Sequence, residues 1–187
     1  MFKKLTAGVL LAALAVTALV PATVSAAPTK NIVEKAIAVN AATGQFDTVL
    51  TAATCEYLDD AVVDILVSPD KTLFAPTDFA FRQLGQALGL GNKGLNPSNV
   101  CSVDSILGDG TLLTILGYHV IDGRVAYRDA VAAIGGKVQM LLGGKAKITG
   151  TPRFVRIDSA LITVKNVRAT NGFIHVVNKV LTPPALG

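Results

Sequence analysis

No cluster of basic residues stands out in this chain of 187 residues. Lys3 and Lys4 lie at the N-terminus, and the other fifteen Lys and Arg residues are spread singly between positions 30 and 179. Nucleic acids and anionic membranes usually select proteins with a concentrated basic patch. We therefore expect neither of them as a partner.

Residues suited to catalysis or metal binding are scarce as well. The chain has two histidines, His119 and His175. It has neither a Gly-x-Ser-x-Gly nucleophile motif nor a His-x-x-x-His pair, and it lacks the closely spaced Cys and His ligands of zinc sites. We predict a protein without enzymatic activity, metal or cofactor, and keep a hydrolase as an alternative.

Two other patterns superficially suggest chemistry. Asp59, Asp60 and Asp64 form an acidic group, but Asp60 and Asp64 are one turn apart on a predicted helix and share a solvent face. The segments Gly-Gly-Lys at 135–137 and 143–145 resemble phosphate-binding loops, yet neither continues with Ser or Thr. We interpret the acidic group as a solvated helix face and the glycine pairs as hairpin turns.

The first 26 residues have the three parts of a secretory signal peptide. A basic head at 1–4 precedes an apolar stretch at 5–20 and an exit of small residues, Val-Ser-Ala-Ala-Pro at 24–28. We predict cleavage after Ala26, no membrane insertion afterwards, and secretion to the periplasm or exterior of a bacterium. The alternative is a membrane anchor, for which this stretch is short because a span takes about 20 residues.

The chain that remains after cleavage suits one domain. It has 161 residues, with fifteen basic and thirteen acidic side chains and therefore a net charge of +2. Its two cysteines, Cys55 and Cys101, would reach an oxidising compartment, where disulfides persist. We predict that they pair; the alternative is two buried free thiols.

Residues 30–108 are predicted to be mostly helical. Apolar residues recur there with helical spacing in three segments, which break at 43–44, 54–55 and 68–70. Each segment has one buried stripe, made of Ile32, Val33, Ala36 and Ile37, of Phe46, Val49, Leu50 and Ala53, and of Leu58, Val62, Ile65 and Leu66.

The same half also contains a predicted strand and a predicted loop. A strand at 72–75 leads into a further helix, for which Thr77 is a suitable N-cap because its hydroxyl can accept from a free amide of the first turn. Asp78 favours the positive end of that helix. The Gly-rich segment 85–98 is predicted to be a surface loop.

The second half is predicted to be β-rich. A short helix at 111–116 leads into a strand at 118–121 and a turn at 122–123. Glycine-containing turns then separate five further strands, predicted at 137–142, 146–149, 154–158, 160–167 and 173–181. A helical half followed by hairpins indicates an α+β domain with a mainly antiparallel sheet.

Three segments carry a recognisable pattern. The chain has Thr-Leu-Phe-Ala-Pro-Thr-Asp-Phe-Ala-Phe at 72–81, Leu-Gly-Tyr-His-Val-Ile-Asp-Gly at 116–123, and Ala-Thr-Asn-Gly-Phe-Ile-His-Val-Val-Asn-Lys-Val-Leu at 169–181, followed by Pro183. In order and spacing, these segments resemble the fasciclin family. The resemblance implies a compact β-sandwich or wedge with helices packed against it, over residues 30–184.

The resemblance also implies adhesion or partner binding rather than catalysis, and it marks Tyr118 and His119 as candidate partner contacts. For His119 and His175 we favour a structural role, with the ring nitrogens bonded to the backbone. Asn178 stands where an Asp is common in the family. The segment Lys-Asn-Val-Arg at 165–168 replaces an acidic stretch linked to integrin binding in animal members, so integrin recognition is not expected.

Two functions follow as hypotheses. The first is a secreted, non-enzymatic adhesion module that binds an extracellular protein or polysaccharide through an exposed face at Tyr118, His119, Asp122 and Arg124. The second is a carrier of a small hydrophobic ligand such as a carotenoid. It is suggested by the Ala, Leu and Val content of the helical half and by the association of some family members with carotenoids.

Overall fold

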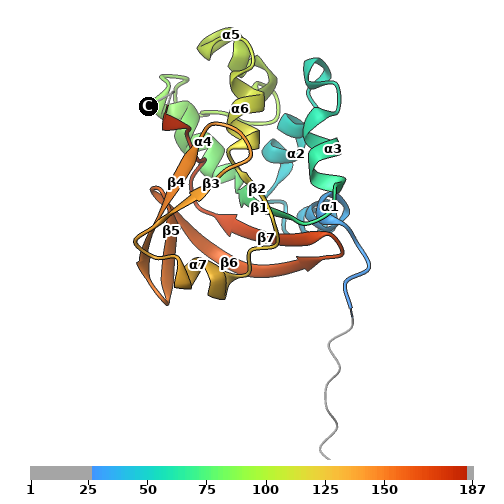
Figure 1. The fold of residues 1–187 in the computed structure, drawn as a ribbon. Helices are drawn as coiled ribbons and strands as arrows, with labels where there is room; N and C mark the ends of the chain where they lie inside the picture. Colours follow the sequence, from blue (N-terminus) through green and yellow to red (C-terminus); the bar gives the residue numbers. More distant parts are fainter. Residues whose placement is uncertain (1–26, 185–187) are drawn as a thin grey trace, which may run out of the picture.

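Seven strands form one twisted sheet, and most of the helices gather on one side of it (Figure 1). The computed structural model describes residues 27–184, so the predicted signal peptide lies outside the described residues. The helices are α1 (Ile32–Thr43), α2 (Asp47–Ala53), α3 (Ala61–Val67), α4 (Asp78–Ala87), α5 (Val103–Leu107), α6 (Thr111–Gly117) and α7 (Tyr127–Ala132), with short 3-10 turns η1 (Glu56–Leu58) and η2 (Val100–Ser102).

The sheet order is β2-β1-β7-β6-β5-β4-β3. Its strands are β1 (Lys71–Pro76), β2 (Val120–Asp122), β3 (Lys137–Gln139), β4 (Lys145–Thr151), β5 (Phe154–Ile157), β6 (Ala160–Ala169) and β7 (Gly172–Val177). The pair β1 and β7 runs parallel, and the other five pairs are antiparallel. This confirms the predicted α+β class with a mainly antiparallel sheet.

The central strands separate two hydrophobic cores. In β1, Leu73 and Ala75 face the core shared with helices α1 to α6, whereas Phe74 faces the core shared with α7 and strands β4 and β5. Successive residues of a strand point to opposite faces, so a strand covered on both sides needs apolar residues at consecutive positions. The continuous run Leu-Phe-Ala at 73–75 meets that need.

Local sequence explains how the helices begin and meet the sheet. Thr77 caps α4 as predicted, since its side chain accepts from the Ala80 amide at 3.3 Å. Asn171, in the turn between β6 and β7, accepts from the Ile32 amide at 2.9 Å and donates to the Leu66 and Ser68 carbonyls, both at 2.8 Å. One side chain therefore joins α1, the end of α3 and the sheet.

The predicted disulfide is present. Cys55 and Cys101 are bonded with their Cα atoms 5.6 Å apart, and the alternative of free thiols is wrong. The bond links the residue that precedes η1 to η2, across 46 positions of sequence.

Some predicted boundaries are wrong. Helix α7 was not predicted, and the glycines at 135–136 lie between α7 and β3 rather than in a hairpin, whereas the pair at 143–144 does join β3 to β4. Asp60 precedes α3 with a left-handed backbone, so it is not on the helix face with Asp64. The strand predicted at 118–121 begins only at Val120, because Tyr118 still belongs to the end of α6.

Candidate functional site

Tyr118 is a structural residue of the second core. Its side chain is 0% exposed, and its hydroxyl donates to the Asp158 carboxylate at 2.9 Å or to the Lys145 carbonyl at 3.2 Å. Burial and the bond to Asp158 both raise the pKa of this hydroxyl. The prediction that Tyr118 contacts a partner is therefore wrong, because a ring enclosed by the sheet has no surface to offer.

His119, the next residue in the turn between α6 and β2, is buried as well. Its Nδ1 lies 2.8 Å from the Ile115 carbonyl, and its Nε2 accepts from the Leu181 amide at 2.8 Å. A carbonyl can only accept and an amide can only donate, so the ring is neutral with its hydrogen on Nδ1. Burial lowers the pKa of His119 to about 4. The structural interpretation is confirmed, and a direct partner contact is ruled out.

His175 has the same kind of role in β7. Its Nε2 lies 3.0 Å from the Val125 carbonyl, its Nδ1 accepts from the backbone N–H of Asn166 at 3.3 Å, and its ring stacks on Phe74. Burial lowers the pKa of His175, against the smaller opposite effect of the bond to Val125. His119 thus ties the segment after β7 to α6, and His175 ties two loops to β7, so both have the structural role that the sequence favoured.

Asp122 and Arg124 remain at the surface, at the edge formed by β2. Asp122 is 72% exposed in its side chain and pairs with Lys71 at 2.7 Å. Arg124 donates to the Thr170 carbonyl at 3.0 Å, and its guanidinium carbon lies 5.6 Å from the ring centroid of Phe173. The structure thus separates the four predicted contacts into two buried and two exposed residues.

An apolar cavity of about 290 Å³ lies between the helices and the sheet. Helices α1, α2 and α3, strand β1 and the end of α6 enclose it, and Ile37, which is 52% exposed, stands at its edge. Its walls include Ile32, Ala36, Phe46, Leu50, Leu66 and Leu116. The sequence places all of these residues except Leu116 in buried stripes, but spacing along one helix cannot show a gap that is left between three helices.

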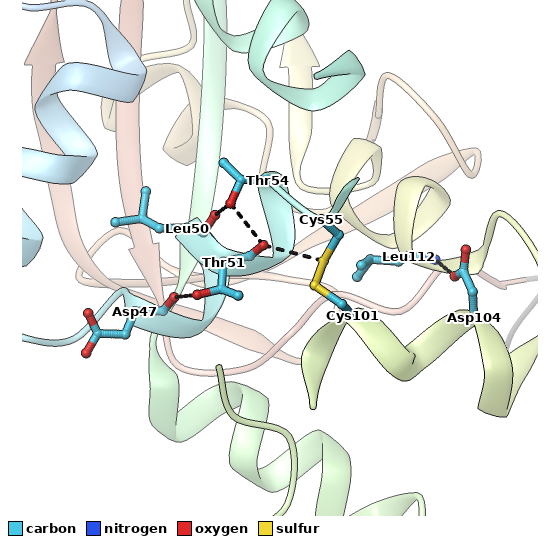
Figure 2. The surroundings of a disulfide bond; sticks show 8 residues. All are labelled: Asp47, Leu50, Thr51, Thr54, Cys55, Cys101, Asp104 and Leu112. Carbon is cyan, nitrogen blue, oxygen red and sulfur yellow. Dashed lines mark hydrogen bonds between the residues drawn. A yellow bond between two sulfur atoms is a disulfide. The ribbon is translucent and has the colours of Figure 1, made fainter. Parts of the chain in front are cut away.

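The polar groups that border this cavity are already bonded. Thr51 donates to the Asp47 carbonyl and Thr54 to the Leu50 carbonyl, so both hydroxyls are turned back to α2 beside the disulfide (Figure 2). His119 also borders the cavity, with both ring nitrogens engaged elsewhere. A ligand here would be held by shape and apolar contact rather than by a charge.

Neither a metal-binding cluster nor a single membrane-spanning helix is present in the part of the chain that the structure describes. Across residues 27–184, no three His, Cys, Asp or Glu side chains lie close enough together to hold a metal ion. Within the same residues no single helix has the length and apolar character to cross a membrane, although the bent pair Val100–Leu107 and Thr111–Gly117 meets both criteria jointly.

The sequence matches the model of one known protein family over most of its length. The model of the Fasciclin domain matches residues 44–183, which is most of the sequence. The chain belongs to the fasciclin family. The resemblance to this family and the fold class, both predicted from the sequence, are thereby confirmed.

Individual relatives of this fasciclin-family chain are bacterial as well as animal. Immunogenic protein MPB70 of Mycobacterium bovis is 32% identical over 152 residues, which cover 80% of this chain and 69% of that protein. Cell surface glycolipoprotein MPB83 of the same species is 30% identical over 128 residues, or 68% of this chain and 50% of MPB83.

A solved structure shares the fold. The FAS1 domain pair from the insect cell adhesion molecule fasciclin I superposes with a TM-score of 0.59 at 15% identity, over 82% of this chain and 51% of that one. At this identity the likeness concerns the fold alone.

Asn178, which stands where an Asp is common in the family, accepts from the Leu161 backbone amide at 2.8 Å. An uncharged amide oxygen therefore makes the contact at this position.

Proposed function

We propose that the protein is an exported, non-enzymatic module that attaches to a protein or polysaccharide of the cell surface or its surroundings. The observation that carries the proposal is the internal use of Tyr118, His119 and His175, whose polar atoms are bonded within the fold. This leaves contact through the exposed surface as the activity to account for. The surface location is supported by MPB83, which is named a cell surface protein.

The proposal is tested by retention of the exported protein on the native cell surface and on wall fractions. At the β2 edge, Asp122→Ala with Arg124→Ala removes the two exposed residues of the predicted face and leaves net charge unchanged. We expect weaker retention if this edge is the contact, with Asp109→Ala and Lys93→Ala as the charge-matched control on the helical half. Equal retention of both variants would reject this edge, and no retention of the unmodified protein would reject surface attachment.

A second candidate function is the carriage of a small hydrophobic ligand, and the apolar cavity favours it. Its volume of about 290 Å³ is near the lower limit of about 300 Å³ for ligand pockets. It is larger than the roughly 150 Å³ of an apolar cavity that binds benzene. A cavity of this size suits one ring or a short chain, so a carotenoid would insert one end past Ile37 and leave the remainder outside.

Extraction of the exported protein with organic solvent, followed by mass spectrometry, tests this second function. We expect an apolar compound that co-purifies with the protein and is lost in Ile37→Asp, which places a charge at the cavity edge. Ala42→Asp, at an exposed position of the same helix, is the control and should retain the compound. A colourless extract without any bound apolar compound would refute carriage.

A further inference from the structure

The charges of this protein are strongly segregated in the folded chain. Residues 27–123, which include helices α1 to α6, contain five Lys or Arg and eleven Asp or Glu, a net charge of −6. Residues 124–184, which include strands β3 to β7, contain ten Lys or Arg and two Asp, a net charge of +8. The near-neutral total therefore conceals a molecule with an acidic part and a basic part.

Part of the basic charge is concentrated on one face of β3, β4 and β5. Lys137 of β3 lies directly opposite Lys147 of β4, and Lys145 lies two residues before Lys147 on the same face. On the next strand, Arg156 lies opposite Thr149, which shares the face with Lys147. We call these four cations, Lys137, Lys145, Lys147 and Arg156, the basic face.

The basic face is open to solvent because the pleat turns the intervening residues inward. All four cations are exposed, whereas their neighbours Ala146, Ile148, Val155 and Ile157 are buried in the core that α7 covers. Strands lie about 4.8 Å apart, and alternate residues are about 7 Å apart along a strand. These spacings place the four cations near one another on a single exposed face of the sheet.

Carboxylates within the described residues do not neutralise this array. Among the ion pairs of residues 27–184, none involves the four cations. Asp158, the acidic residue that follows β5, uses one oxygen for the Lys147 amide at 2.8 Å and the other for the Tyr118 hydroxyl at 2.9 Å. Like charges directly opposite each other destabilise a strand pair. The pair Lys137 and Lys147 therefore opposes folding, and a bound anion would relieve it.

The uncharged residues of this face indicate which polyanion fits. Thr149 and Thr151 place hydroxyl groups on the same face as the cations, and Phe154, opposite Thr151, is 62% exposed. Gln139 also lies on this face, but its amide nitrogen donates to the Met140 and Gly144 carbonyls. Hydrogen-bonding groups around one exposed ring suit a sugar chain. A membrane surface would need a larger apolar area than one ring, and single-stranded nucleic acid is usually held by several stacked aromatic residues.

We infer that the face of β3, β4 and β5 binds an acidic polysaccharide, whose carboxylate or sulfate groups lie on Lys137, Lys145, Lys147 and Arg156. This inference rests on the proposed attachment to the cell surface and names the class of partner. The cations interact with the acidic groups, and Phe154 packs against a sugar ring. Long-range attraction by the basic part of the molecule also speeds the encounter at low ionic strength.

The test is a titration of the exported protein with alginate, a linear polymer of uronic acids, with neutral dextran as the reference polymer. Lys137→Gln with Lys147→Gln should weaken alginate binding about tenfold at low salt, because both charges leave the contact. Lys30→Gln with Lys93→Gln changes the net charge equally at exposed positions outside the face and should weaken it less than about twofold. Phe154→Ala should weaken binding at high salt as well.

Several outcomes would overturn the inference. An equal loss in the two double variants would mean attraction by net charge alone. Binding to vesicles of anionic phospholipid or to single-stranded DNA, without binding to alginate, would assign the face to another partner. Retention on the native cell surface that does not change in Lys137→Gln with Lys147→Gln, together with no alginate binding, would reject this face and leave the proposed function standing. Thermal unfolding of each variant shows whether it is folded.

Discussion

At the scale of single residues, His119 holds the end of the chain against α6. Its two ring nitrogens satisfy the Ile115 carbonyl and the Leu181 amide in a site that water does not reach. Each buried backbone group left without a partner costs about 1–3 kcal/mol. A single imidazole therefore fixes the segment that follows β7.

The burial of His119 predicts a pH-dependent stability. Its pKa is about 4 in the folded protein and about 6.5 in an unfolded chain. Between these pH values the unfolded state binds a proton that the folded state does not, so stability present above pH 6.5 is lost as the pH falls to about 4. The loss from this group is about 3 kcal/mol, measurable by urea unfolding at pH 7.5 and pH 4.

His119→Gln separates this effect from the titration of carboxylates. The amide can donate to Ile115 and accept from Leu181 but does not titrate, so the variant should be less stable at pH 7.5 and should lose less stability on acidification. His175 shifts the pH dependence in the same direction and is unchanged in both proteins. An identical pH dependence in the variant would contradict the role assigned to His119.

Gly85 provides a second prediction at this scale. It lies within α4, where Ala is favoured over Gly by about 1 kcal/mol, but a Cβ atom here would lie 2.0 Å from the Leu95 backbone nitrogen. We expect Gly85→Ala to lower the free energy of unfolding by at least about 1–3 kcal/mol, as overpacking does. Gln83→Ala, at an exposed position of the same helix, should change it by less than about 0.5 kcal/mol.

Urea unfolding of both α4 variants gives the comparison. A Gly85→Ala protein as stable as the unmodified chain would show that the segment around Leu95 can move away from α4. The sequence indicates a glycine-rich loop over 85–98, and that prediction holds for most of the segment. It could not show that Gly85 itself is helical, or that the backbone of Gly94 and Leu95, later in the same segment, packs against it and leaves no room for a Cβ atom.

At the scale of elements, the disulfide joins two short segments whose own sequences do little to stabilise their structure. Cys55 immediately precedes η1 and Cys101 lies in η2, and neither 3-10 turn has a side-chain cap. Closing a loop of 46 residues contributes roughly 4 kcal/mol in the chain-entropy model. The bond also lies next to α2, which forms one wall of the apolar cavity.

Removal of this bond should therefore destabilise the protein. We expect Cys55→Ala with Cys101→Ala to lower the free energy of unfolding by about 2–4 kcal/mol, measured by the urea midpoint. Amide hydrogen exchange should increase most in α2, η1 and η2, because these elements lose their link. Adding a reductant to the unmodified protein should have nearly the same effect; an unchanged midpoint under reduction would contradict it.

Elements that the sequence predicts have a clear hydrophobic pattern of their own, whereas the element that it misses depends on contacts with the rest of the fold. Strands β4 and β5 are predicted near their observed ranges because buried and exposed residues alternate over the first four residues of β4 and throughout β5. Helix α7 has six residues, too few for its spacing to stand out, and it is held by contacts such as the Tyr127 hydroxyl with the Val155 amide at 3.3 Å. Its formation depends on the sheet that it covers.

At the scale of the whole molecule, the domain begins before the family match does. The match starts at residue 44, but α1 precedes it, with a capping box formed by Asn31 and Glu34. Ile32 is completely buried, and its amide is bonded to Asn171 in the turn between β6 and β7. Helix α1 therefore belongs to the folded unit.

We expect a chain that starts at residue 44 to be unfolded or poorly soluble. For a measurement on a folded protein, Ile32→Ala should lower the free energy of unfolding by about 2–5 kcal/mol. Ile37→Ala, the same change at an exposed position of the same helix, should cost less than about 1 kcal/mol. Urea unfolding compares the two, and equal losses would show that α1 is peripheral.

The sequence by itself determined the resemblance to the family and the α+β class, predicted the disulfide, and favoured a structural role for both histidines. The class and the family follow from local periodicity and motif spacing, the disulfide from the oxidising compartment that the predicted leader implies, and the role of the histidines from the rule that buried polar groups need partners. Only the tertiary structure decided that Tyr118 and His119 are enclosed, that three helices leave an apolar cavity, and that singly spaced cations meet on one face. Each of these depends on how strands and helices far apart in the chain pack side by side. The spacing of residues along the chain does not give the distances in space between such elements.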